Sequence, residues 1–237
     1  MDAQARPAPA TCDEIARLID VPLLRPELTA DQVSTGLDSA KRAGVSCVVL
    51  RPCDVDFAAR SLAGSAVRMA SACGFPHGSA NTAAKLYEAR DLLRRGAKEI
   101  HMVAPISKLL SREFQHVQTE FLQMSELCRK ESAVLCVILE TGYLSDELKI
   151  IACRTAERAE VHFVKNATGF GPEGYVLDDV RLMRHHLPED IGVAACGAVA
   201  TLDRLLELHA AGCDRIETDA AAAILDEWKA RHAAPST

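Results

Sequence analysis

The stretch TAAKLYEARDLLRRGAKEIHMV, residues 82–103, decides the fold because it shows one complete passage from helix to strand. Its first part, 82–95, has the pattern of an amphipathic helix. Gly96 follows, and glycine is the residue that most easily adopts the left-handed backbone that ends a helix. The apolar run 99–103 then predicts a buried strand.

The same order of helix, glycine and strand recurs along the chain. Helical segments 31–43 and 201–211 end at Gly44 and Gly212, each just ahead of a strand. The alternation indicates βα units and a parallel sheet. Its β-type runs are residues 18–24, 46–50, 68–73, 99–103, 134–139, 161–164, 192–196 and 215–218. Eight such units predict an α/β fold of the TIM (β/α)₈ barrel type, since an open doubly wound sheet has more often about five or six strands.

Length and composition favour one globular unit. Of the 237 residues, 49% are hydrophobic and 25% are charged, which is enough apolar material to bury a large core. Single barrels of about 200 to 250 residues are common. We therefore expect one barrel domain at residues 13–228, with a flexible N-terminal tail at 1–12 and a C-terminal tail at 229–237.

Charge and hydropathy exclude several classes of partner. The net charge is -6, and the basic residues are scattered among acidic ones, so a nucleic-acid partner is not expected. No apolar run approaches the roughly 18 to 20 residues of a membrane-spanning helix, and the first eleven residues lack a hydrophobic signal core. We expect a cytoplasmic protein without a membrane partner.

The cysteines and histidines give no sign of a metal or cofactor. The nine cysteines are an odd number spread singly, without a C-x-x-C spacing, which argues against a disulfide framework and a zinc ribbon. Those in apolar runs are expected to pack as small hydrophobic residues. The eight histidines lack a ligand spacing, and no Gly-x-Gly-x-x-Gly follows the first run. The sequence thus predicts neither a metal nor another cofactor.

In a barrel of this type, reactive groups lie at the C-terminal ends of the strands and in the loops that follow. This rule favours polar residues and glycines in the strands or in the loops that follow them. They are Asp20, Arg51, His101, Glu140, Lys165, Thr168, Gly169, Gly197 and Asp219.

Lys165 is the best candidate for a reactive group. It comes directly after the run 161–164, so its side chain is expected to point into the barrel or its mouth. Lost hydration would lower its pKa and free the neutral amine that attacks a carbonyl. A lysine paired with a nearby carboxylate such as Glu140 would fit the same position, and the position does not decide between the two.

Several stretches carry a resemblance to a known family. They are Ile19-Asp20 with 23–26 (LLRP), 74–78 (GFPHG), 138–141 (ILET), 163–170 (FVKNATGF) and 179–184 (DVRLMR). On these stretches the chain resembles the deoxyribose-phosphate aldolases, class I aldolases of the DeoC type, over residues 19–225. The resemblance implies a TIM barrel and an imine between Lys165 and the substrate aldehyde. It also implies the metal-free reversible aldol cleavage of a deoxy sugar phosphate.

The sequence departs from that family at three places. His101 stands where the family has an aspartate for proton transfer, and Ala194 where a second lysine keeps the reactive amine neutral. The family's phosphate-binding turns read here Gly197-Ala198 and 217–220 (ETDA). Two carboxylates there would repel a phosphate dianion by about 1 kcal/mol per close pair even in water. We therefore expect a substrate without phosphate.

Arg51 and His101 each have two interpretations. Arg51 could anchor a substrate carboxylate with two hydrogen bonds, or it could form an ion pair with Asp54 or Asp56. His101 could move protons and, when charged, partly replace the missing cation near Lys165. It could equally be a packed, hydrogen-bonded histidine in an inactive site.

Three hypotheses for function follow. The first is a lyase that forms a Schiff base through Lys165 with a small aldehyde or ketone, with His101 as proton shuttle and Asp20 and Thr168 as hydrogen-bonding support. The second is a catalytically silent barrel that binds a small molecule or protein. The third is an imine-free cyclase or isomerase of a biosynthetic pathway. A homodimer is compatible with each of them.

Overall fold

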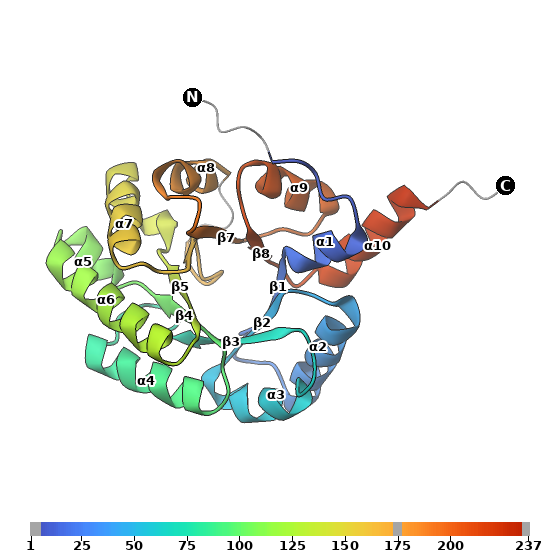
Figure 1. Cartoon of the computed structure of the whole chain (residues 1–237), viewed down its shortest axis with the longest axis horizontal. Coiled ribbons are helices and arrows are strands. Elements are labelled where there is room, and N and C mark those ends of the chain that lie inside the picture. The colour runs from blue at the N-terminus through green and yellow to red at the C-terminus, as the bar shows by residue number, and fades with distance from the viewer. Residues whose placement is uncertain (1–5, 173–176, 234–237) are drawn as a thin grey trace.

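A computed structural model describes residues 6–172 and 177–233, and its strands close into a barrel (Figure 1). All neighbouring strands are parallel and pair in sequence order, and β8 pairs with β1. The strands are β1 (Ile19–Leu23), β2 (Cys47–Leu50), β3 (Arg68–Cys73), β4 (Glu99–Val103), β5 (Val134–Ile138), β6 (Phe163–Lys165), β7 (Gly192–Cys196) and β8 (Arg215–Glu217). The predicted TIM barrel is confirmed.

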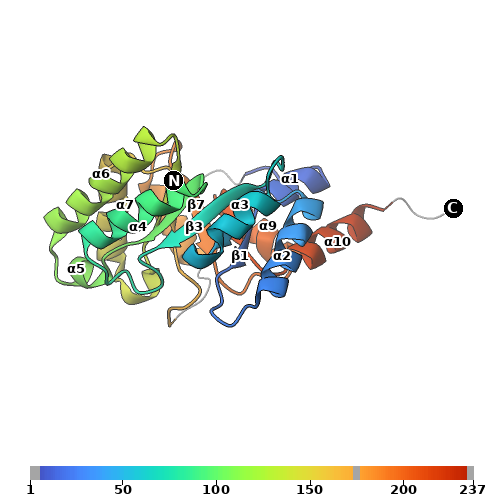
Figure 2. The same ribbon diagram turned by 90° about the horizontal axis from the view of Figure 1, so that it is seen from below.

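Helices surround the barrel, as the views along and across its axis show (Figures 1 and 2). The short α1 contacts α10, and the two lie together at the edge of the ring of helices in Figure 1. The helices are α1 (Cys12–Arg17), α2 (Ala30–Ala43), α3 (Val55–Ser61), α4 (Thr82–Arg94), α5 (Ile106–Leu110), α6 (Phe114–Lys130), α7 (Asp146–Arg158), α8 (Leu177–His186), α9 (Leu202–Ala210) and α10 (Ala221–His232). Two 3₁₀ turns, η1 (Pro52–Asp54) and η2 (Thr141–Tyr143), follow β2 and β5.

Alternation along each strand divides apolar side chains between two cores. Residues such as Val48 and Ile100 belong to the large core between the strands and the helices. Residues of the opposite parity in β2 and β3, together with Leu24 just after β1, form a smaller apolar cluster inside the barrel: Leu24, Cys47, Val49, Ala70 and Ala72. Successive side chains of a strand point to opposite faces. In β4, β6 and β8, the side chains that point into the barrel include the ionisable residues Glu99, His101, Lys165, Arg215 and Glu217.

The glycine punctuation ends helices, with one difference in detail. Gly44 is the C-cap residue of α2 and has a left-handed backbone with φ 65°. Gly96 and Gly212 come one residue after the C-cap residues of α4 and α9, with φ 113° and 100°. These positive φ values are the reason that glycine is favoured at each position.

The predicted run 161–164 is shifted in the structure. The backbone N–H of Val161 donates to Ala156 O (3.3 Å), a bond that closes the end of α7. Such a bond over five residues is typical of the turn that terminates a helix. Strand β6 therefore begins at Phe163 and includes Lys165 as its last residue.

The predicted tails make more contacts than expected. Arg6 NH1 lies 2.6 Å from Asp214 Oδ1. The side chain of Thr11 caps the N-terminus of α1, which begins at Cys12. At the other end α10 continues to His232. Residues 1–5 and 234–237 of these tails lie outside the described part of the chain. Within residues 6–172 and 177–233, no helix combines the length and apolar character needed to cross a membrane.

A buried ion pair fixes α4 against α6 beside β4. Lys85 Nζ lies 2.6 Å from Glu120 Oε1, and both side chains are buried. Lys85 also donates to the carbonyl of Val103 (2.9 Å), and Thr82 Oγ1 donates to Glu120 Oε2 (2.8 Å). The pair thus holds the C-terminal end of the strand that carries His101.

We expect Glu120→Leu to lower the free energy of unfolding by about 3–5 kcal/mol, because it leaves the Lys85 ammonium buried without a counter-ion. The double variant Lys85→Met/Glu120→Leu should recover much of that loss. Urea denaturation followed by circular dichroism measures both. The exposed variant Glu113→Leu, which breaks a surface pair with Lys108, is the control and should change stability little. A single variant as mild as the control would contradict the prediction.

Candidate active site

Lys165 lies inside the barrel at the C-terminal end of β6, with 1% of its surface exposed. Its Nζ donates a short hydrogen bond to Glu217 Oε2 on β8. On the other side, Nζ lies 3.4 Å from His101 Nδ1 on β4. Each of the three residues occupies an inward-pointing strand position, so the barrel wall brings them together from separate segments of sequence.

The charge state of Lys165 differs from the expectation. Burial is the largest single influence and lowers the pKa of Lys165. The charge and hydrogen bond of Glu217, together with Cys196 and Cys136, outweigh burial, so the net pKa is raised. The predicted lowered pKa is therefore wrong. The alternative of a lysine paired with a carboxylate agrees with the structure, but the partner is Glu217, not Glu140. Ala194 lies beside Lys165 in the sheet register, so its side chain supplies no cation to depress this pKa.

A chain of charged side chains continues from His101 toward the N-terminal end of the barrel. His101 Nε2 lies 2.7 Å from Glu99 Oε1, which also accepts from Arg215 NH1 (2.6 Å). Arg215 Nε in turn donates to Asp20 Oδ1 (3.0 Å). Burial raises the pKa of Asp20. Burial also acts to raise the pKa of Glu99, but bonds and charges from His101 and Arg215 lower it overall.

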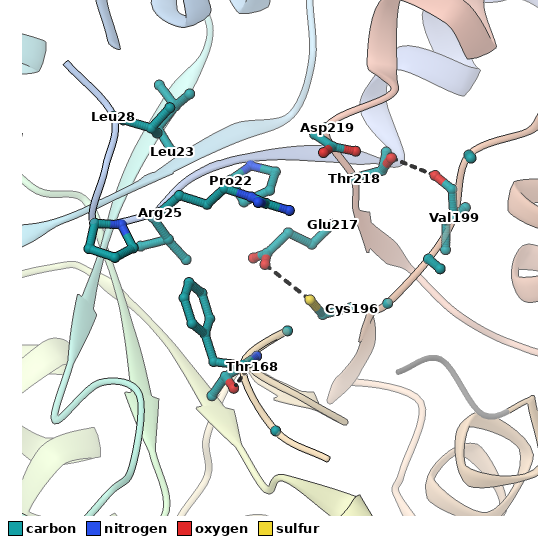
Figure 3. Close-up of a pocket in the computed structure, with 18 of the residues that line it drawn as sticks. Pro22, Leu23, Arg25, Leu28, Thr168, Cys196, Val199, Glu217, Thr218 and Asp219 are labelled. Atoms are coloured by element: carbon teal, nitrogen blue, oxygen red, sulfur yellow. Dashed lines mark hydrogen bonds between the residues drawn. The ribbon is translucent and has the colours of Figure 1, made fainter. Parts of the chain in front are cut away.

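A cavity of about 890 Å³ opens at the C-terminal mouth above Lys165, between the ends of β1, β6, β7 and β8 (Figure 3). Glu217 lines it, and its side chain extends toward the middle of the residues shown. Cys196 Sγ donates to Glu217 Oε1 (3.3 Å). Burial, followed by the nearby Glu217 charge, raises the pKa of the Cys196 thiol. The cavity thus meets the lysine through the carboxylate of Glu217.

The predicted site residues fall into three groups. Several line the cavity, namely Thr168, Gly169, Gly197 and Asp219. Lys165, His101 and Asp20 belong to the buried charge chain beneath it. Glu140 bonds through Oε2 to the backbone N–H (3.1 Å) and the hydroxyl of Thr168.

Arg51 holds a loop through the hydrogen bonds of its guanidinium group. Its Nε donates to Asp54 Oδ2 (2.6 Å), which agrees with the ion-pair interpretation. NH1 donates to the carbonyls of Arg25 (3.0 Å) and Pro26 (3.1 Å), and NH2 donates to that of Leu28 (3.1 Å). The alternative of a substrate anchor is therefore not supported, because the guanidinium is already engaged and Arg51 is outside the described lining of the cavity.

Sequence reasoning missed Glu99 and Arg215 and did not identify Glu217 as the lysine's partner. A signal was present: Glu99-Ile100-His101 and Arg215-Ile216-Glu217 place charged or titratable residues at alternate positions of otherwise apolar strands. That period of two marks one face of a strand. In the described part of the chain, no three histidine, cysteine or acidic side chains converge as a metal-binding group.

The barrel with polar groups at the C-terminal ends of its strands has the arrangement of barrel enzymes. Comparison with known proteins then gives the family. Residues 18–192 match the model of the DeoC/LacD family aldolases. The deoxyribose-phosphate aldolase of Caldanaerobacter subterraneus subsp. tengcongensis is 38% identical over 216 residues, which cover 91% of this chain and 94% of that protein. That of Thermococcus kodakarensis is 36% identical over 215 residues, 90% of this chain and 96% of that protein.

Solved structures agree with the sequence comparison. The deoxyribose phosphate aldolase from Aeropyrum pernix, described as tetrameric, superposes with a TM-score of 0.87 at 28% identity, covering 94% of each chain. The protein therefore belongs to the DeoC/LacD family of aldolases, which are carbon–carbon lyases. The resemblance stated from the sequence motifs is confirmed at the level of the family.

We expect Arg215→Leu to lower the free energy of unfolding by about 3–5 kcal/mol at neutral pH, because Asp20 and Glu99 lose their shared buried cation. In the variant the pKa of Asp20, which burial already raises, is higher in the folded state than in the unfolded state. The folded state then takes up protons as the pH falls, so the loss should be smaller at mildly acidic pH. Thermal and urea unfolding across this range measure it. A loss independent of pH would contradict the explanation, and Arg231→Leu on exposed α10 is the control.

Proposed function

We propose that this protein is a lysine-dependent aldolase that forms a Schiff base through Lys165 with a small aldehyde or ketone lacking phosphate. The observation that carries the proposal is the buried contact between Lys165 Nζ and Glu217 at the floor of the cavity. Burial favours the neutral amine that a lysine nucleophile needs, and the adjacent carboxylate can accept the proton that Nζ must lose.

The first steps need one proton to move within the ion pair. Nζ gives a proton to Glu217 Oε2, which leaves a neutral amine and a carboxylic acid. The amine then attacks the carbonyl carbon, and a proton moves from the attacking nitrogen to the carbonyl oxygen, which becomes the hydroxyl of a carbinolamine. Glu217 returns its proton to that hydroxyl, water leaves, and the protonated imine again faces the Glu217 carboxylate. With a neutral carbonyl compound bound next to this pair, each of these proton transfers spans only a hydrogen-bond distance.

His101 is suited to the carbon–carbon step. It accepts the proton of the substrate's β-hydroxyl group, and the electrons of the breaking bond move to the imine nitrogen, giving an enamine and a free aldehyde. The same imidazolium then protonates the enamine carbon, and hydrolysis of the imine restores Lys165. The bond between His101 Nε2 and Glu99 holds the ring so that Nδ1 faces Nζ.

The charges around the cavity favour a substrate without phosphate. The relatives are named for a phosphorylated sugar, deoxyribose phosphate. Here the lining includes the carboxylates of Glu217, Asp219 and Glu27. Arg25, which also lines the cavity, lies 3.6 Å from Glu27. A phosphate dianion would meet more negative than positive charge there.

The same ion pair also supports the imine-free alternative. With its pKa raised, Lys165 is an ammonium in the resting protein and can act as a general acid, while Glu217 acts as the base. An isomerisation or cyclisation needs such a pair and no covalent intermediate. Turnover that survives loss of the lysine amine would select this alternative.

The direct test is trapping with borohydride. We expect incubation with 2-deoxyribose, acetaldehyde and other small carbonyl compounds to add a covalent mass to the wild type, measured by intact mass spectrometry. Lys165→Met should lose the adduct and its aldol turnover while folding normally. Lys98→Met, which removes an exposed lysine next to β4, is the matched control and should keep both. No adduct with any carbonyl compound would overturn the Schiff-base proposal.

Glu217→Gln separates the pKa of the lysine from its catalytic use. Without the carboxylate, burial is left as the main influence, so the pKa of Lys165 should fall. The pH midpoint of borohydride trapping should therefore move to lower pH, while aldol turnover falls because the proton acceptor is lost. Trapping and steady-state rates across pH measure the two effects. An unchanged midpoint would show that Glu217 does not hold the proton on Lys165.

A further inference from the structure

A second, smaller cavity lies on the other side of Phe170. Its volume is about 290 Å³, and Thr168, Phe170 and Gly171 line both it and the large cavity. Phe170 packs edge-on against Phe75, with ring centroids 5.2 Å apart. Phe170 therefore lies between the two cavities, and Phe75 packs against it. The rest of the second lining is Pro76, His77, Ile106, Ser107, Leu110, Glu140 and Tyr143.

Glu140 brings an unpartnered buried oxygen to this cavity. Only 2% of the residue is exposed, and its Oε2 accepts from the backbone and the hydroxyl of Thr168. Its Oε1 is buried and has no hydrogen-bond donor among the described residues. Gly171, which also lines the cavity, lies against this oxygen, because a Cβ on Gly171 would be 2.5 Å from Oε1.

An unsatisfied buried carboxylate oxygen is costly, by about 1–3 kcal/mol or more. A ligand that donates a hydrogen bond would remove that cost. Most of the wall is apolar, from Pro76, Ile106, Leu110 and Phe170, and the described lining contains no lysine or arginine. This combination fits a short apolar group with a hydroxyl or ammonium end, and it rejects an anion.

We propose that this second cavity is a binding site for a small molecule that donates a hydroxyl or ammonium hydrogen to Glu140 Oε1. The site is separate from the imine chemistry of Lys165 and does not require it. Thr168 connects the two, because its hydroxyl is bonded to Glu140 and the residue lines both cavities. A molecule bound in the second cavity therefore contacts residues that also form one wall of the first cavity.

Three probes of matched shape test the site: n-butylamine, n-butanol and butyrate. Each is titrated at neutral pH into protein with carbon-13 labelled isoleucine methyl groups and followed by NMR. Ile106 lines the cavity and reports occupation, whereas Ile15 is a buried residue of α1 in the main core. We expect Ile106 to shift with butylammonium and butanol while Ile15 does not. The Kd for butylammonium should be at least about tenfold lower than for butyrate.

Glu140→Gln should reverse this preference. The amide oxygen of glutamine must accept the two bonds from Thr168, which turns its NH₂ group toward the position of Oε1. The cavity then offers a donor, so butyrate should bind more tightly than butylammonium. Glu131→Gln, at the exposed end of α6, is the matched control and should keep the wild-type order. Lys165→Met should also keep it, which distinguishes this site from failure of the Schiff-base proposal.

A second variant keeps the test decisive if Glu140→Gln does not fold. Ser107 is exposed on α5 and lines the cavity, so Ser107→Trp fills the space without changing a buried residue. It should weaken butylammonium binding by at least about tenfold. The proposal is overturned if Ile106 responds to no probe, if all three probes bind alike, or if Ser107→Trp leaves binding unchanged.

Discussion

The ion pair between Lys165 and Glu217 is the interaction on which the site depends. Both groups are buried, and removing two charges from water costs several kcal/mol per ion unless the geometry compensates. Here the compensation comes from the barrel itself, which fixes β6 and β8 and so the distance between the two side chains. The cost of keeping the pair explains why it is flanked by further polar contacts, from His101 on one side and Cys196 on the other.

The pair is one end of a longer polar path through the barrel. From the cavity floor the contacts pass through His101 to Glu99, which Arg68 reaches from the N-terminal end with 41% of its side chain exposed. The opposite part of the interior is apolar, formed by β2 and β3. Each group in this path influences the pKa of its neighbour. A change of protonation at the mouth therefore changes the pKa values of the groups further along the path. The low dielectric of the interior strengthens that coupling, and the apolar part keeps water out.

The fold could be predicted in detail because its signals are local. A helix that ends at a glycine ahead of an apolar run is read within about twenty residues, as in 82–103. Site residues were predictable where a rule about strand ends applies, which placed Thr168 and Asp219 at the cavity. The partner of Lys165 was not, because it depends on which side chains of separate strands face each other across the barrel. Arg51 was ambiguous for a similar reason, since apart from Asp54 its partners are backbone carbonyls that no side-chain pattern reveals.

The hydrogen bonds from Arg51 to the loop at residues 25–28 affect which substitutions this part of the barrel mouth can accept. The guanidinium grips main-chain oxygens at Arg25, Pro26 and Leu28, and the side chains of that loop form part of the cavity wall. Backbone oxygens are present whatever residue occupies a position. The loop can therefore exchange its side chains, and with them the chemistry of one wall, while its shape is retained. Evolution or a protein engineer can thus vary substrate preference at this loop without redesigning the scaffold.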